Sequence, residues 1–195
     1  MILNKPSGLL SVPGRGPDKA DCLISRAKDI FPTALTVHRL DMETSGLIIL
    51  ALNKDMQRAM SRLFEQRKIS KTYIARVFGN PSQESGRIDL PVITDWPNRP
   101  KQIVDHDRGK AAQTEWQTIT HEGNITRLHL TPITGRTHQL RLHMEAMGHP
   151  ILGDSLYGTP QSRAAAPRLQ LHATTLSFQH PVSSKTCTLS CKPPF

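Results

Sequence analysis

The feature that most constrains this chain is an uninterrupted apolar run, Leu47-Ile48-Ile49-Leu50-Ala51-Leu52. A run of this length beside turn-forming residues is typical of a strand that is buried on both faces. A polar segment, His38 to Gly46, precedes it, and the short extended segment Thr36-Val37 comes before that. We therefore expect a loop held at both ends by the core, which is where catalytic side chains are commonly placed.

Asp41 is the acidic side chain near the middle of this loop, and it follows the basic residue Arg39. One interpretation is that Asp41 and Ser45 only form a turn, and that Gly46 supplies a backbone angle that other residues avoid. Local chemistry alone favours this interpretation. Only other segments of the chain can indicate a catalytic role for Asp41.

The chain is strongly basic, with 25 Lys and Arg residues against 16 Asp and Glu, a formal net charge of +9. A domain with this charge is a candidate for binding a polyanion, most often nucleic acid. A basic surface that only serves solubility is the alternative. The basic residues recur beside the loops and do not form one tail, so charge alone leaves both interpretations open.

Composition also bears on where the protein works. No apolar run approaches the ~20 residues that a helix needs to cross a bilayer, so no membrane partner is expected. The segment from Met1 to Pro6 lacks a signal-peptide layout, and export is not expected. The three cysteines, Cys22, Cys187 and Cys191, form no disulfide framework, which predicts a reducing compartment, the cytoplasm. Nothing suggests an association helix, so we expect a monomer.

Periodicity predicts three helices and several strands. We expect one helix capped by Asp21 that ends before Pro32, one capped by Asn53 that runs to about Arg67, and one capped by Thr137 that runs to Met147. Strands are expected over residues 71–78, 115–119, 125–130, 169–178 and 186–191. Residues 91–110 are basic and proline-containing, and we expect an irregular loop that contacts RNA or only connects two elements.

These elements show no regular alternation of strand and helix. They predict a single α+β domain over residues 1–195, with a mixed, largely antiparallel sheet flanked by helices and loops.

A second polar segment, Gly135 to His143, contains Arg136, His138 and Arg141. An arginine that emerges beside an apolar helix face can hold a buried carboxylate through two hydrogen bonds. The alternative is a helix start whose charges lie in solvent. The histidines lack tight metal spacing and no acid cluster is nearby, so we expect no metal ion and no other cofactor.

Several segments together resemble the RluA family of RNA pseudouridine synthases. The matching segments are His38-Arg39-Leu40-Asp41 with Thr44-Ser45-Gly46, Asn4-Lys5-Pro6-Ser7-Gly8, Lys71-Thr72-Tyr73, Gly135-Arg136-Thr137-His138-Gln139-Leu140-Arg141, Gly148 to Asp154, and Leu156-Tyr157-Gly158. They cover nearly the whole chain in the family's order. The segment from Asp95 to Gln102 is most similar to members that act on both large-subunit ribosomal RNA and transfer RNA.

The resemblance implies an isomerase that converts uridines of structured RNA stem-loops to pseudouridine without a cofactor. Asp41 would attack the anomeric carbon of the target uridine or take its ribose 2′ proton. Arg141 would pair with Asp41, and Tyr73 would stack on the uracil. Arg39 would enter the RNA where the base has flipped out. The residues implied in RNA contact are Arg39, His38, Arg136, His138 and Leu142.

The family normally has more sequence before its Asn-Lys-Pro motif, whereas only Met1 to Leu3 precede it here. No amino-terminal S4-type domain is present in the sequence, so target choice is expected to lie in this domain. Two alternatives are a non-catalytic RNA-binding protein, and a hydrolase that uses Asp41 and Glu43 as paired carboxylates.

Overall fold

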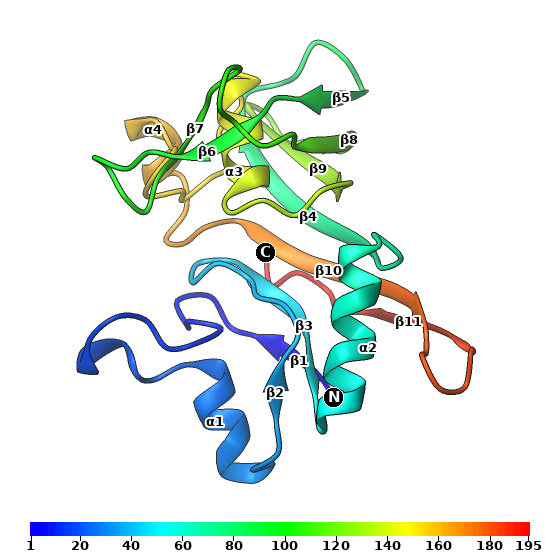
Figure 1. Cartoon of the computed structure of the whole chain (residues 1–195). Helices are drawn as coiled ribbons and strands as arrows, with labels where there is room; N and C mark the ends of the chain where they lie inside the picture. The colour runs from blue at the N-terminus through cyan, green and yellow to red at the C-terminus, as the bar shows by residue number, and fades with distance from the viewer. The chain divides into compact units, whose positions relative to one another are not determined.

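The structure is a computed structural model that describes residues 1–195, and the chain divides into two compact units. The first unit contains residues 1–71 and 172–194, and the second contains residues 72–171 and Phe195. Both belong to an α+β fold with a mixed, mostly antiparallel sheet, which confirms the predicted fold class (Figure 1).

The first unit is built around β3. Its elements are β1 (Ile2–Lys5), a 3₁₀ turn (Pro17–Lys19), α1 (Leu23–Ile30), β2 (Leu35–Thr36), β3 (Ser45–Ala51), α2 (Lys54–Glu65), β10 (Leu171–Gln179) and β11 (Thr186–Ser190). Strands β1 and β2 pair antiparallel with β3, β10 runs parallel to it, and β11 pairs antiparallel with β10.

Every residue of β3 is buried, which confirms the predicted strand for Leu47 to Ala51; Leu52, the last residue of the apolar run, lies outside the strand and is exposed. Figure 1 shows α2 lying along β3, and its partly buried Met56, Leu63 and Phe64 pack on the cluster that contains Leu47 and Ile49. Asn53 caps α2 by accepting a hydrogen bond from the Met56 backbone N–H at 2.8 Å, which confirms that prediction.

Gly46, in β3, explains how β10 can approach so closely. Its φ is +114°, and a Cβ atom at this position would lie 2.3 Å from the backbone oxygen of Ala173 in β10. Only glycine can combine this backbone angle with this contact. Gly46 therefore allows the end of the Asp41 loop to lie directly against the backbone of β10.

The second unit is an antiparallel sheet with a helix on one face. Its elements are β4 (Ser70–Phe78), β5 (Ser85–Asp89), β6 (Val92–Thr94), β7 (Gln102–Val104), β8 (Gln113–His121), β9 (Ile125–Pro132), α3 (Gln139–Ala146) and α4 (Pro160–Ala164). The strand order is β4-β9-β8-β5, and β6 and β7 form a separate hairpin.

The core of this unit lies between the sheet and α3. Ala75 and Val77 of β4 are completely buried, and Tyr73 packs against the same cluster. Leu140 and Met144 of α3 belong to this cluster. The face of β4 that carries Tyr73, Ala75 and Val77 is the one that meets this core.

Three expectations about local structure were wrong. Cys22, not Asp21, precedes the first turn of α1, and the Ser25 hydroxyl accepts a hydrogen bond from its backbone N–H. Asp21 instead binds Arg26 through two hydrogen bonds. The cap of α3 is His138, with a φ of +53°, and not Thr137.

The third wrong expectation was an irregular loop over residues 91–110. Strands β6 and β7 lie in this stretch and pair from Val92 to Val104. Their short length kept the strand pattern below what periodicity can detect.

Candidate active site

Asp41 lies on the loop between β2 and β3, where its side chain is partly buried. Its backbone carbonyl accepts a hydrogen bond from the Thr44 N–H at 3.2 Å, which closes a turn. Leu40 before it and Thr44 after it are buried. The segment is therefore a loop in which a turn holds Asp41 between buried neighbours, and the catalytic role of Asp41 stays a prediction.

Lys5 stabilises this loop through hydrogen bonds. Its side chain is completely buried, and its ammonium donates hydrogen bonds to the backbone carbonyls of Pro6 at 2.9 Å, Leu9 at 2.7 Å and Met42 at 2.9 Å. The three acceptors use all three N–H donors of a charged lysine. Lys5 therefore ties the segment after β1 to the residue that follows Asp41.

Two serines from the same segment fix the loop on both sides of Asp41. The Ser7 hydroxyl donates to the Glu43 carbonyl at 2.7 Å. The Ser11 hydroxyl donates to the Leu40 carbonyl at 2.7 Å and accepts from the Leu40 N–H at 3.0 Å. Residues 5–11 thus form a polar cradle for the Asp41 loop; we call residues 5–11 the loop cradle.

The charge of Lys5 also matters to the loop. Burial lowers the pKa of Lys5 from 10.5 to about 8, although the negative charges of Asp41 and Glu43 act to raise it. An ammonium this deeply buried is costly unless it is bonded and faces opposite charge. The loop cradle therefore places positive charge under the two carboxylates of the loop.

His38, predicted to contact RNA, has a structural role in this loop. Its Nε2 accepts a hydrogen bond from the Ile49 backbone N–H at 2.9 Å, and its ring packs on Phe64 with centroids 4.3 Å apart. Because Nε2 is the acceptor, the ring is neutral with its proton on Nδ1. Arg39, the next residue, is exposed.

In the second unit Arg141 is bound to a carboxylate that the sequence analysis did not name. Its Nε and Nη2 donate to the two carboxylate oxygens of Asp154 at 2.8 and 2.7 Å, and both side chains are buried. Burial acts to raise the pKa of Asp154, but the hydrogen bonds and charge of Arg141 lower it below its ordinary value. Arg141 is therefore held rigidly by a bidentate ion pair.

Asp154 and Tyr157 extend this network to the β6–β7 hairpin. One Asp154 oxygen accepts hydrogen bonds from the backbone N–H groups of Leu156 and Tyr157. The Tyr157 hydroxyl accepts from the Gln102 N–H at 2.8 Å and lies 2.9 Å from His138 Nδ1. The Tyr157 hydroxyl thus forms hydrogen bonds with both the hairpin and the start of α3.

The remaining predicted residues of this segment differ in exposure. Arg136 is exposed, and its Nε donates to the Ala111 carbonyl at 3.2 Å. Leu142 is 5% exposed and packs with Val92 and Ala112. The side chain of Leu142 lies within this apolar cluster. Its contact with RNA stays a prediction.

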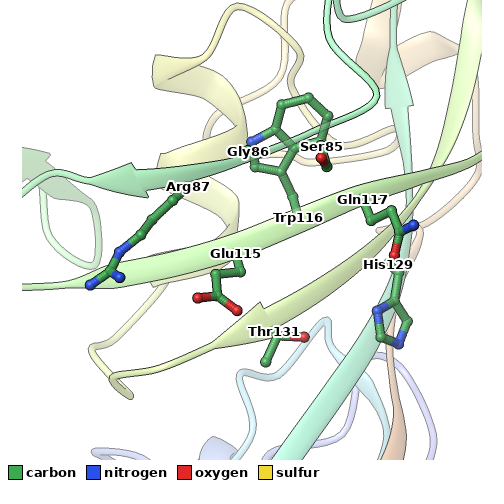
Figure 2. Close-up of a pocket in the computed structure, with 8 residues that line it drawn as sticks. All are labelled: Ser85, Gly86, Arg87, Glu115, Trp116, Gln117, His129 and Thr131. Atoms are coloured by element: carbon green, nitrogen blue, oxygen red, sulfur yellow. The ribbon is translucent and has the colours of Figure 1, made fainter.

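The sheet of the second unit carries a pocket of about 570 Å³, lined by Ser85, Gly86, Arg87, Glu115, Trp116, Gln117, His129 and Thr131 (Figure 2). None of the predicted site residues lines it. Arg87, Glu115 and Thr131 are cross-strand partners on β5, β8 and β9. In Figure 2 the Trp116 ring lies on the opposite side of the strand from Glu115.

The roles of Lys5, Asp154 and Tyr157 were not predicted, although all three residues lie within the motifs that carried the resemblance. No pattern in the sequence shows that a lysine is buried or which carboxylate an arginine binds. The only available signal was that each residue lies in a segment shared with the family.

The comparisons with known proteins identify the family. The model of the RNA pseudouridylate synthase family matches residues 1–146. The chain belongs to this family. It is 55% identical over 196 aligned residues to the dual-specificity RNA pseudouridine synthase RluA of Yersinia pestis, with 100% of this chain and 95% of that protein covered.

Other relatives agree with this assignment. The protein of the same name from Escherichia coli K12 is 51% identical, with 100% of this chain and 90% of that protein covered. The solved structure of human RNA pseudouridylate synthase domain containing 1 has a TM-score of 0.82 and 28% identity, covering 100% of this chain and 80% of that one. These findings confirm the RluA family that the motifs indicated. No helix in the structure has the length and hydrophobicity needed to span a membrane.

The buried pair of Arg141 and Asp154 gives a prediction about stability. Asp154→Asn should lower the free energy of unfolding by about 3–5 kcal/mol, because the buried guanidinium loses the negative charge that it binds through two hydrogen bonds. Thermal and denaturant unfolding would measure this loss. Glu122→Gln is the control in the same unit: it removes a partly exposed ion pair with Arg76, and the change should stay below about 1 kcal/mol. Equal effects of the two variants would contradict the account.

His38 gives a prediction about pH. Burial and, to a smaller extent, the positive charge of Lys71 lower the pKa of His38 from 6.5 to about 3. Between these values the unfolded chain binds a proton that the folded chain does not, so stability falls as pH drops from 6.5 towards 3.

In His38→Gln the slope of the free energy of unfolding against pH should be smaller by up to about 1.4 kcal/mol per pH unit within that window. Denaturant titrations between pH 4 and pH 7, with His106→Gln as the control for an exposed histidine, would test this. An unchanged slope in His38→Gln would show that His38 is not held neutral.

Proposed function

We propose that this chain is an RNA pseudouridine synthase that isomerises uridines in stem-loops of both large-subunit ribosomal RNA and transfer RNA. The observation that carries the proposal is the 55% identity, over the full chain, to a protein named dual-specificity RNA pseudouridine synthase RluA. The Asp41 loop supports it, because hydrogen bonds from the loop cradle fix the backbone on both sides of Asp41.

The reaction moves the ribose from one atom of uracil to another. The bond between N1 and the anomeric carbon breaks, uracil turns, and C5 bonds to the anomeric carbon while the C5 proton is lost and N1 gains one. Asp41 starts the reaction by one of two routes, attack on the anomeric carbon or removal of the ribose 2′ proton. The reaction has no net redox change or hydrolysis, so it needs no redox cofactor.

Arg141 and Tyr73 are the other proposed catalytic residues. Arg141 would keep Asp41 ionised and oriented, a role that suits an arginine already held by Asp154 through two hydrogen bonds. Tyr73 would stack on the uracil and lie near the proton that leaves C5. The family resemblance supports both assignments.

RNA contacts are assigned to Arg39, Arg136, His38, His138 and Leu142. Arg39 and Arg136 are exposed, which suits contact with phosphates or with an RNA helix that has lost a flipped base. Flipping a base costs a few kcal/mol, and a side chain inserted into the stack offsets part of that cost. His38 and His138 would contribute to RNA binding indirectly: His38 fixes the backbone at Ile49, and His138 stands at the start of α3.

Further parts of the proposal concern the whole molecule. We propose that both units form one catalytic domain, that the protein acts as a monomer, and that it works in the cytoplasm. The free cysteines support a reducing compartment.

The first test of this function is tritium release from RNA labelled at C5 of uridine, on transcripts of both RNA classes. Wild-type protein should release tritium from both, and Asp41→Asn should lower the rate by at least about a thousandfold while the protein stays folded. Glu43→Gln is the matched control, because Glu43 is a carboxylate on the same loop; it should keep substantial activity.

Three outcomes would contradict the proposal. Turnover by Asp41→Asn would remove Asp41 from the mechanism. Free uracil as the product would indicate a hydrolase that uses Asp41 and Glu43. Tight RNA binding by the wild type without any release would favour a non-catalytic RNA-binding protein.

A further inference from the structure

The tip of the β6–β7 hairpin presents a large aromatic ring to solvent. We call residues 95–101 the hairpin tip. Trp96 lies there and is 65% exposed, whereas Trp116, the other tryptophan of the chain, is 7% exposed. Leaving an indole in water forfeits the free energy that burial of its apolar surface would give. An exposed indole on an ordered element therefore needs an explanation.

The hairpin tip is ordered by its own hydrogen bonds. The Asp95 N–H donates to the Lys101 carbonyl at 3.0 Å, and the Lys101 N–H donates to the Asn98 carbonyl at 3.1 Å. The Asn98 side chain donates to the Asp95 carboxylate at 2.9 Å. Trp96 is thus carried by a closed turn, so placing its ring against a ligand costs little conformational entropy.

Arg99 lies against the Trp96 ring. Its guanidinium carbon is 4.7 Å from the ring centroid, and its Nε donates to the Trp96 carbonyl at 3.2 Å. An arginine over an indole is a cation–π contact that steadies the ring. The guanidinium places positive charge over one face of the ring, so a base would stack on the other face with this charge close to its phosphate.

The hairpin tip is also anchored to the helix that carries Arg141. Gln102, the first residue of β7, donates its backbone N–H to the Tyr157 hydroxyl, and that hydroxyl bonds to His138 at the start of α3. Tyr157 in turn lies 5.3 Å, ring centroid to guanidinium carbon, from Arg141. A ligand held on the hairpin tip would therefore be held in a fixed position relative to α3.

The charges of the hairpin tip favour a nucleic acid as the ligand. Asp95 is bonded to Asn98 within the turn, and Asp105, further along, is paired with Arg108. Arg99, against the Trp96 ring, and Lys101 supply the positive charges of the hairpin tip. Aromatic rings flanked by basic residues are what proteins use to stack unpaired bases, at about 1–3 kcal/mol per base.

We infer that the hairpin tip is a stacking platform, on which Trp96 binds an unpaired base of the substrate RNA other than the uridine that reacts. This inference rests on the proposed function for the identity of the RNA. Stacking accepts every base because each has an aromatic face. A platform of this kind allows two RNAs of different sequence to be held by one protein through a shared loop shape.

The direct test is the accessibility of Trp96 to acrylamide when RNA binds. Trp116→Phe leaves Trp96 as the only fluorophore of its kind; should that variant not fold, the unsubstituted chain serves, since Trp116 is buried. Transcripts of a transfer RNA anticodon stem-loop and a ribosomal RNA hairpin are added to saturation in an Asp41→Asn background. The quenching constant of Trp96 should fall at least about threefold with both. An unchanged constant with both RNAs overturns the inference.

Kinetics separate stacking from a structural role of the indole. Trp96→Ala should raise KM about tenfold or more for both RNAs, as loss of one stacked base predicts, with kcat within about twofold of wild type. Trp96→Phe should recover most of the KM effect. Ile119→Ala, at an exposed apolar residue of β8, is the control and should leave KM unchanged. A wild-type KM in Trp96→Ala overturns the inference.

The two proposals fail in different ways. If RNA shields Trp96 but the wild type releases no tritium, the platform stands and the isomerase proposal falls. If tritium is released at the wild-type rate while Trp96 stays fully accessible, the isomerase proposal stands and the platform falls.

Discussion

The interaction on which the candidate site depends most is the buried ammonium of Lys5. Isolating a charge from water is costly, so a buried lysine is tolerated only where hydrogen bonds and opposite charges replace the water. Here three backbone carbonyls do so, and one of them belongs to Met42, next to Asp41. Because a buried ammonium without partners is costly, the loop adopts the conformation that places the Met42 carbonyl within hydrogen-bond distance of Lys5. Asp41 is positioned as a consequence.

The second unit uses the same principle with a different cation. Arg141 is buried, and Asp154 satisfies its planar guanidinium with two hydrogen bonds. The backbone of Leu156 and Tyr157 then fixes Asp154, and the Tyr157 hydroxyl reaches both His138 and the β6–β7 hairpin. In each unit a cation that cannot be left without partners organises the surrounding loops. Both cations come from segments that the sequence shares with the family.

The sequence predicted the elements whose patterns are long and regular. The apolar run of β3 and the helical spacing and Asn53 cap of α2 were correct because burial and capping act locally there. Prediction failed where tertiary contacts decide. His138 rather than Thr137 precedes α3, with a φ of +53° and a contact to Tyr157, which lies 19 residues further along the chain. The β6–β7 hairpin is too short to show a period, and the pairing of Arg141 with Asp154 joins residues that local reasoning treats separately.

The central claim is that the buried charge of Lys5 positions Asp41, and the measurement that tests it is the kcat for tritium release by Lys5→Met. Methionine keeps the length and apolar stem of the side chain but provides no ammonium. The account predicts that kcat falls at least about a hundredfold while the affinity for RNA stays within about threefold, because the phosphate-binding surface is intact. A wild-type kcat in a folded Lys5→Met protein would contradict it.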